Sequence, residues 1–186
     1  MAEVTISNSP VHSDIIITYP YGVADTGYSC GWHVGIDFAP YGNTENNPLL
    51  YPVKKGRVVY INNSTNVALG VQCQILDEDG IYWRYCHMVA NSLQVQVDDI
   101  VTINTPIGRM GETGNVTGRH LHLEASRTQS WNCETFVNPT TILGIPNIDN
   151  TIIKYDGNTP IITKSRKTKF PWVLYVNKLR NRRKIF

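Results

Sequence analysis

Two histidines stand one residue apart in the segment GRHLHLEA, residues 118–125. If this segment is a β-strand, His120, His122 and Glu124 share one face, because successive side chains of a strand point to opposite sides. The leucines that alternate with them would then face the core. A pair of histidines in a strand is often only solvated surface, so its meaning depends on the other segments that carry histidine.

Two further segments hold residues of matching chemistry. In GWHVGIDF, residues 31–38, His33 and Asp37 lie four positions apart, and in an extended chain they share a face. In YCHM, His87 ends a predicted strand, and Tyr85 is expected on the same face. Four of the five histidines therefore lie in segments with other features of a site.

These side chains are suited to binding a metal ion. A catalytic zinc has three protein ligands, commonly His nitrogens and carboxylate oxygens, and the fourth position is left to water. His33, Asp37 and one member of the H-x-H pair would make such a set. The other member and His87 would flank the open position, where they could exchange protons or donate hydrogen bonds.

Three other residues are weaker candidates for a role in the site. His12 stands apart from the other histidines, and we expect it at the surface without partners. Cys30 lies three residues before His33 and offers a thiolate that the ligand set does not require. Glu124 is either an ordinary strand carboxylate or a group that orients a ligand imidazole.

The elements that must position these residues are short strands. Runs rich in β-branched and aromatic residues, bounded by turn-forming residues, predict strands. They lie at residues 56–63, 70–76, 81–88 and 119–125. The turn signal DEDG, residues 77–80, should join the second and third of these strands into a hairpin. Helical periodicity is scarce, so we predict a mainly β fold built from antiparallel sheets.

Length and cysteine content set further bounds. The 186 residues fit one domain with an appendage, and the 41% hydrophobic content suffices for a proper core. Among the four cysteines there is no C-x-x-C pair, which argues against a zinc ribbon or a thioredoxin-type motif. The sequence leaves open whether any pair of cysteines is oxidised, and we expect free, buried thiols if the protein matures in a cytoplasm.

Charge divides the chain into two parts. Residues 161–186 hold nine of the 17 Lys and Arg and no acidic residue, so residues 1–160 carry a balance of −7. We predict a folded domain over residues 1–147, followed by a linker and a basic, aromatic extension over residues 148–186. The linker has room for one strand, at Thr151–Tyr155.

The N-terminal residues lack the basic start and apolar run of a signal peptide, and no apolar run is long enough to span a membrane. These features lead us to expect synthesis in a cytoplasm, with no signal peptide and no membrane span.

The order and spacing of the motifs resemble one known family. H-x-x-x-D, followed about 80 residues later by H-x-H with Y-x-H between them, is similar to the lysostaphin/LytM-type zinc endopeptidases of bacterial cell walls. Longer segments resemble the same family: ITYPYG at residues 17–22, YPVKKGRVV at 51–59, and the loop and strand at 97–124. The likeness covers about residues 15–145. Arg119 is a departure, because the family more often has proline at that position.

The resemblance implies a LytM-like domain of the duplicated hybrid motif and a role for each site residue. His33, Asp37 and His122 would bind Zn²⁺, and His87 and His120 would be the catalytic pair. No H-E-x-x-H glutamate is present to act as a base, so a histidine would have to fill that role.

From the resemblance we expect zinc-dependent hydrolysis of peptide bonds in bacterial peptidoglycan, in the stem peptide or the cross-bridge. The expected lack of a signal peptide suits a bacteriophage protein that acts on the cell wall, either as a lysin or as a virion-mounted hydrolase. Two alternatives stay open. One is a structural component of the phage tail tip, and the other is a partner-binding domain of the same fold with little or no activity.

The basic extension has two interpretations. Its cations would be attracted to anionic wall polymers. Alternatively, FPWVLYV at residues 170–176 offers enough apolar surface to dock on the domain or on phage tail proteins. Nucleic acid is not expected as a partner.

Overall fold

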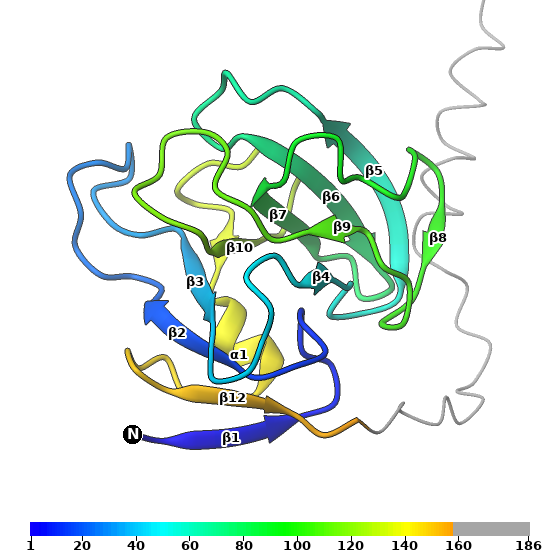
Figure 1. Cartoon of the computed structure of the whole chain (residues 1–186). Helices are drawn as coiled ribbons and strands as arrows, with labels where there is room; N and C mark the ends of the chain where they lie inside the picture. Colours follow the sequence, from blue (N-terminus) through cyan, green and yellow to red (C-terminus); the bar gives the residue numbers. More distant parts are fainter. Residues whose placement is uncertain (158–186) are drawn as a thin grey trace, which may run out of the picture.

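The computed structural model describes residues 1–157, so most of the predicted extension lies outside the described residues. The described chain is mainly β, which confirms the predicted fold class (Figure 1). A short helix, α1 (Pro139–Leu143), follows its N-cap Asn138. The strands are β1 (Glu3–Ile6), β2 (Ile15–Tyr19), β3 (Gly35–Pro40), β4 (Leu49–Leu50), β5 (Gly56–Asn62), β6 (Val71–Asp77), β7 (Tyr82–Met88), β8 (Ile100–Val101), β9 (Gly108–Arg109), β10 (Leu121–Ser126), β11 (Phe136–Val137) and β12 (Ile152–Tyr155).

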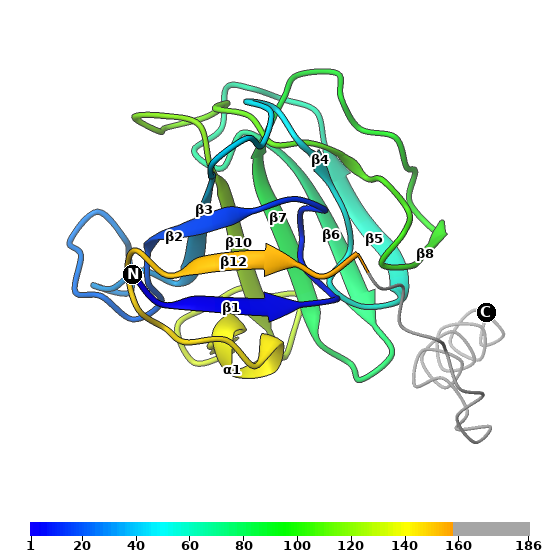
Figure 2. The same cartoon turned by 60° about the horizontal axis from the view of Figure 1, so that its bottom comes forward.

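Ten of these strands form one sheet, in the order β1-β12-β2-β3-β10-β7-β6-β5-β8, with β11 paired to β10. Its pairs are antiparallel except that of β1 with β12, which is parallel (Figure 2). β4 and β9 form a separate small sheet. At the centre, β10 lies between β3 and β7, which brings the three histidine-bearing segments side by side.

The predicted hairpin is formed by β6 and β7, and its turn is held by Asp77. One carboxylate oxygen of Asp77 accepts hydrogen bonds from the backbone N–H groups of Asp79 and Ile81, each at 2.9 Å. The other accepts from the indole N–H of Trp83 at 2.9 Å. The Asp77 carboxylate thus takes the place of backbone carbonyl groups as the acceptor for two N–H groups of the turn.

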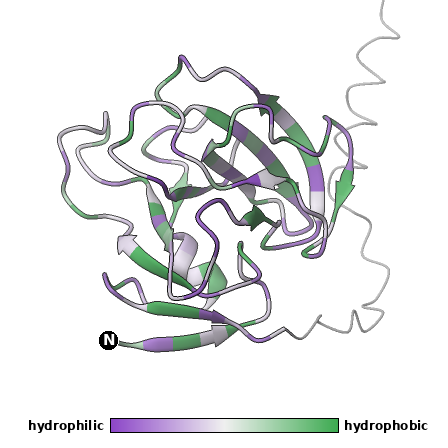
Figure 3. Cartoon of the chain, in the orientation of Figure 1, coloured by the Kyte–Doolittle hydropathy of each residue, from purple (hydrophilic) through white to green (hydrophobic). Residues whose placement is uncertain are grey.

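Alternation along the central strands builds the core. Leu121 and Leu123 are fully buried, as predicted, and they pack in a cluster that includes Ile75, Trp83 and Tyr85. Figure 3 shows the resulting bands of hydrophobic and hydrophilic residues along β5, β6 and β7. Every residue of β10 is buried, so His122 and Glu124 are covered rather than solvated. His120 lies just before the strand, and its side chain is 18% exposed.

A β-bulge near the end of β7 changes which way His87 points. Val71 of β6 pairs with Met88, and Cys73 pairs with Tyr85, so two residues of β7 stand opposite one of β6. His87 takes up the irregularity with a φ of 60°. A regular strand would place His87 and Tyr85 on one face, but an extra residue reverses the alternation. The predicted sharing of a face is therefore wrong: the Tyr85 hydroxyl is buried in the core and accepts a hydrogen bond from the Val53 N–H.

β12 lies between β1 and β2, one strand in from the edge of the sheet. It pairs with both β1 and β2. The strand follows residue 147, where we predicted that the folded domain ends. The division of the chain at residue 147 stays a prediction. His12 lies nearby, and its ring is stacked between those of Tyr51 and Tyr155, with centroids 3.6 and 4.2 Å away. The prediction that His12 has no partners is therefore wrong.

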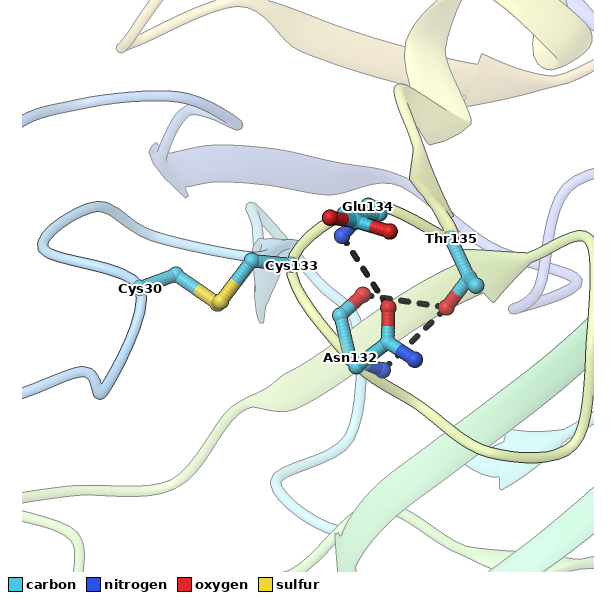
Figure 4. The surroundings of a disulfide bond; sticks show 5 residues. All are labelled: Cys30, Asn132, Cys133, Glu134 and Thr135. Carbon is cyan, nitrogen blue, oxygen red and sulfur yellow. Dashed lines mark hydrogen bonds between the residues drawn. A yellow bond between two sulfur atoms is a disulfide. The ribbon is translucent and has the colours of Figure 1, made fainter.

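A disulfide joins Cys30 to Cys133 across 103 residues of sequence (Figure 4). Cys30 lies in the loop before β3, and Cys133 lies in the loop between β10 and β11. The second loop is tightened by Asn132, whose carboxamide oxygen accepts from the Glu134 N–H (Figure 4). The expectation of free thiols is wrong for this pair and holds for Cys73 and Cys86, which are free and buried. None of the helices among the described residues has the length and apolar character needed to cross a membrane.

Candidate metal centre

Three side chains predicted as zinc ligands converge on one point. Asp37 of β3 stands directly opposite His122 of β10 in the strand register, and His33 lies just before β3. His122 Nδ1 lies 2.7 Å from Asp37 Oδ1 and 3.1 Å from His33 Nε2. His33 Nε2 lies 3.2 Å from the same Asp37 oxygen. Both imidazoles are buried, whereas the Asp37 side chain keeps 13% of its exposure.

The outer nitrogens of the two rings are occupied by acceptors. His33 Nδ1 lies 2.9 Å from the carbonyl oxygen of Pro20, and His122 Nε2 lies 3.0 Å from Glu124 Oε1. These oxygens can only accept, so the outer nitrogens carry the hydrogens. The inner nitrogens, 3.1 Å apart, are then left with lone pairs that face each other beside a carboxylate. Such an arrangement requires a cation at its centre.

The donor set fits zinc. Two imidazole nitrogens and a carboxylate oxygen are the ligands that a three-ligand zinc site uses. Bonds of about 2.0–2.1 Å in a tetrahedral arrangement would separate the ligand atoms by roughly 3.3 Å. The three ligand atoms lie within 4.8 Å of one another, and the two bonds that orient the rings are already made. In the described part of the chain, no other cluster of three such residues has this arrangement.

Behind the site, a buried ion pair supports Glu124. Arg84 of β7 pairs with Glu124 of β10, and its Nε donates to Glu124 Oε2 at 2.5 Å. The guanidinium lies over the ring of Trp131, 4.1 Å from the ring centroid. Burial would raise the pKa of Glu124, but hydrogen bonds and charges from His122 and Arg84 lower it. Glu124 therefore accepts as a carboxylate, and its hydrogen bond to His122 favours a role in orienting that ring.

The same charges control protonation when no metal is bound. Burial by itself would lower the pKa of His122, but the hydrogen bonds and charges of Asp37 and Glu124 raise it to about 9. Burial would raise the pKa of Asp37, whereas His122 and His33 hold it well below its usual range. Without metal, the cation at the centre would be a proton on His122. A bound metal ion must displace that proton, so binding weakens as the pH falls.

His87 and His120 form a pair beside the three candidate ligands. Their ring centroids are 4.9 Å apart, and His120 Nε2 lies 3.7 Å from Asp37 Oδ2. His87 Nδ1 donates to the carbonyl of Thr113 at 2.9 Å, and His120 Nδ1 donates to that of Gly118 at 2.8 Å. In a neutral ring with this bond, the Nε2 atom is left as an acceptor. Burial lowers the pKa of His87 to about 4, so this imidazole is neutral at pH 7.

All five predicted site residues therefore lie together, and the roles assigned to them stay predictions. The sequence interpretation missed Arg84, Trp131 and Tyr28. Aligning the charges of β7 and β10 would reveal the Arg84–Glu124 pair, but this requires the strand register. Tyr28, whose ring is 5.2 Å from that of His33, reaches the site from a loop with no periodic pattern. Cys30 is excluded as a thiolate ligand by its disulfide.

Comparisons with known protein families and with known proteins both point to the same group of peptidases. Residues 31–136 match the model of Peptidase family M23. Lysostaphin from Staphylococcus simulans is 31% identical over 106 residues, which is 57% of this chain and 20% of lysostaphin. Glycyl-glycine endopeptidase ALE-1 from Staphylococcus capitis is 30% identical over 125 residues, covering 67% of this chain and 33% of ALE-1. The matched parts thus span a fifth to a third of these relatives.

Solved structures agree. The catalytic domain of lysostaphin superposes with a TM-score of 0.57 at 29% identity, covering 69% of this chain and 91% of that domain. A zinc-containing peptidase from Vibrio cholerae superposes with a TM-score of 0.53 at 26% identity, covering 66% of this chain and 37% of that protein. The likeness to lysostaphin-type catalytic domains bears out the predicted fold.

Proposed function

Since this chain belongs to peptidase family M23, we propose that it is a zinc-dependent endopeptidase that hydrolyses peptide bonds of bacterial peptidoglycan. The observation that carries the proposal is the convergence of His33, Asp37 and His122 on one point beside the His87–His120 pair. The peptidoglycan substrate is supported by the likeness to lysostaphin, and the peptide bond by the name of the glycyl-glycine endopeptidase.

In this proposal the ligands and the histidine pair have separate tasks. A bound zinc would lower the pKa of a water molecule to about 7 and polarise the carbonyl of the scissile bond. His87 is neutral at pH 7, and its free Nε2 can accept the proton of that water. His120, held by the Gly118 carbonyl, is placed to stabilise the developing oxyanion once it carries a proton on Nε2.

The remaining residues of the site act by holding these groups. Glu124 and the Pro20 carbonyl keep the ligand rings turned toward Asp37. The Thr113 carbonyl accepts from Nδ1 of His87 and so leaves Nε2, on the other side of the ring, free to act. Oriented groups of this kind reduce the entropic cost of reaching the transition state. The site is therefore organised before substrate arrives.

The proposal is tested by mass spectrometry of fragments released from purified cell walls of known composition. We expect new amino and carboxyl ends at one type of peptide bond, and glycyl-glycine cross-bridges are the first substrate to try. A chelator should stop the release, and added zinc should restore it. Walls that stay intact under these conditions would favour the alternative of a partner-binding domain. Lysin and virion-mounted forms would be distinguished by probing purified phage particles with an antibody.

A further inference from the structure

An open pocket lies next to the histidine pair and is lined in part by two arginines. Its volume is about 520 Å³, and its lining includes Arg109, Arg119 and Glu112. The same segments hold the catalytic candidates. Arg119 directly precedes His120, whose N–H donates to the Gly111 carbonyl at 3.2 Å, and Gly111 also lines the pocket. A peptide whose scissile bond lies at the two histidines would place neighbouring residues at this pocket.

The two arginines differ in how firmly they are engaged. Arg109 Nη1 donates to the Asn47 carbonyl at 2.7 Å and to Glu45 at 3.2 Å, so it serves the packing of the pocket wall. Arg119 has only the longer contact to Glu112, at 3.3 Å, and the Glu112 side chain is 57% exposed. An exposed ion pair of this kind contributes little and is readily exchanged.

Arg119 has hydrogen-bonding capacity to spare. A guanidinium carries five N–H donors in a planar fork. Among the described residues, Nη2 of Arg119 reaches only Glu112, and Nε has no hydrogen-bond partner. The Nε is buried, so an incoming group would meet the two amino nitrogens of the guanidinium. A carboxylate accepts two parallel bonds from such a fork, and this geometry separates arginine from lysine. An incoming carboxylate would replace the Glu112 carboxylate at little cost.

We propose that Arg119 determines specificity by binding a carboxylate of the substrate peptide in this pocket, close to the scissile bond. The proposal rests on the endopeptidase function proposed above and adds a substrate class, namely peptides with an acidic group near the bond that is cut. Glu112 contacts Nη2 of Arg119 in the free enzyme and leaves it when the substrate carboxylate arrives. Substrates that lack the acidic group would leave the Arg119–Glu112 pair as it is.

The test uses soluble glycine peptides that carry glutamate or glutamine at one position at a time on either side of a central glycyl-glycine bond. At one position, kcat/KM for the glutamate peptide should exceed that for its glutamine partner by about tenfold, the value of one charge-assisted hydrogen bond. The difference should lie in KM. Arg119→Gln should remove the preference and leave cleavage of the glutamine peptide within about twofold of wild type.

Two further variants sharpen the result. Glu112→Gln frees Arg119 and should strengthen the preference for the glutamate peptide. Arg127→Gln removes the same charge from an exposed side chain that does not line the pocket, and it should keep the preference. If Arg119→Gln fails to fold, Arg119→Lys serves instead, because it keeps the charge without the fork and should retain only part of the preference.

Binding of the same peptides, measured by calorimetry, separates this proposal from the proposed function. A protein that binds glutamate peptides more tightly through Arg119 but cleaves neither peptides nor walls would keep the pocket and contradict the peptidase. Cleavage with no preference at any position, or an equal loss for both peptides in Arg119→Gln, would overturn the role of Arg119 and keep the peptidase.

Discussion

His122 is held from both sides, by Asp37 at the candidate metal position and by Glu124 behind the ring. Glu124 is in turn neutralised by Arg84, so an acidic group can be kept in a buried position without being protonated. The imidazole at the candidate metal position is therefore fixed in orientation by a chain of buried charges. The contribution of these charges to zinc affinity and to stability can be measured by removing one of them.

Glu124→Gln should weaken zinc binding by about 10–100-fold, as expected when a group that orients a metal ligand is lost. It also leaves Arg84 buried without its partner, which should lower the free energy of unfolding by about 3–5 kcal/mol. Competition with a chelator, at a temperature where both proteins are folded, measures the affinity. The exposed Glu134→Gln is the matched control, and equal zinc affinity in Glu124→Gln would contradict the role of Glu124.

His87→Asn should keep the zinc and the fold but lose about 10²–10⁴-fold in turnover, the usual contribution of a general acid–base group. Asparagine tolerates the positive φ at this position, so the variant tests the ring rather than the backbone. Zinc content and kcat are measured on one preparation. Turnover within about tenfold of wild type would remove His87 from the catalytic pair.

The lowered pKa of His87 also has a consequence for stability. Between its ordinary value of 6.5 and about 4, the unfolded chain binds a proton that the folded chain does not. His87 should therefore cost stability as the pH falls through this range, by at most about 1.4 kcal/mol per pH unit, and add nothing further below it. Denaturant unfolding of metal-free wild type and His87→Asn at pH 7, 6 and 5 measures the difference. A difference that does not change with pH would show that His87 is not buried as a neutral ring.

At the scale of elements, alternation along β10 predicted both the core leucines and the histidine face, because side chains of a regular strand follow a period of two. The same rule failed on β7, where one extra residue reverses the period and turns His87 away from Tyr85. The sequence YCHM contains no residue pattern that predicts a bulge. The Arg84–Glu124 pair was missed for a related reason, since it depends on which residues of two strands stand opposite each other.

The disulfide was missed because its cysteines are 103 residues apart and only the folded chain brings them together. It links the loop before His33 to the loop that carries Trp131, which covers Arg84. Cys133→Ser should lower the free energy of unfolding by about 2–4 kcal/mol. Cys30→Ser should cost the same, and the double variant should cost no more than either. Alkylation of the unfolded protein without reductant should label only Cys73 and Cys86, and labelling of all four would contradict the pairing.

At the scale of the molecule, the described residues contain a continuous core to which β2, β3, β10 and β12 all contribute. Removal of residues 158–186 should therefore leave the fold and the cleavage of soluble peptides unchanged. Those residues carry nine basic side chains. If these charges bind the wall, the binding of the intact protein should fall as salt rises, since charges are screened beyond about 8 Å at 0.15 M. Truncation should therefore weaken wall binding and remove its dependence on salt. Aggregation or a lower melting temperature would favour the docking interpretation, and unchanged wall binding would exclude the electrostatic one.

The central claim is that His33, Asp37 and His122 hold the zinc on which peptidoglycan hydrolysis depends. Its most direct test is a titration of zinc into metal-stripped protein, with bound zinc and wall hydrolysis measured in the same samples. Hydrolysis should rise in proportion to bound zinc and level off at about one ion per chain. His122→Ala should bind no zinc at this site and should stay inactive. Full hydrolysis by the stripped protein, or a His122→Ala variant that keeps its zinc, would contradict the claim.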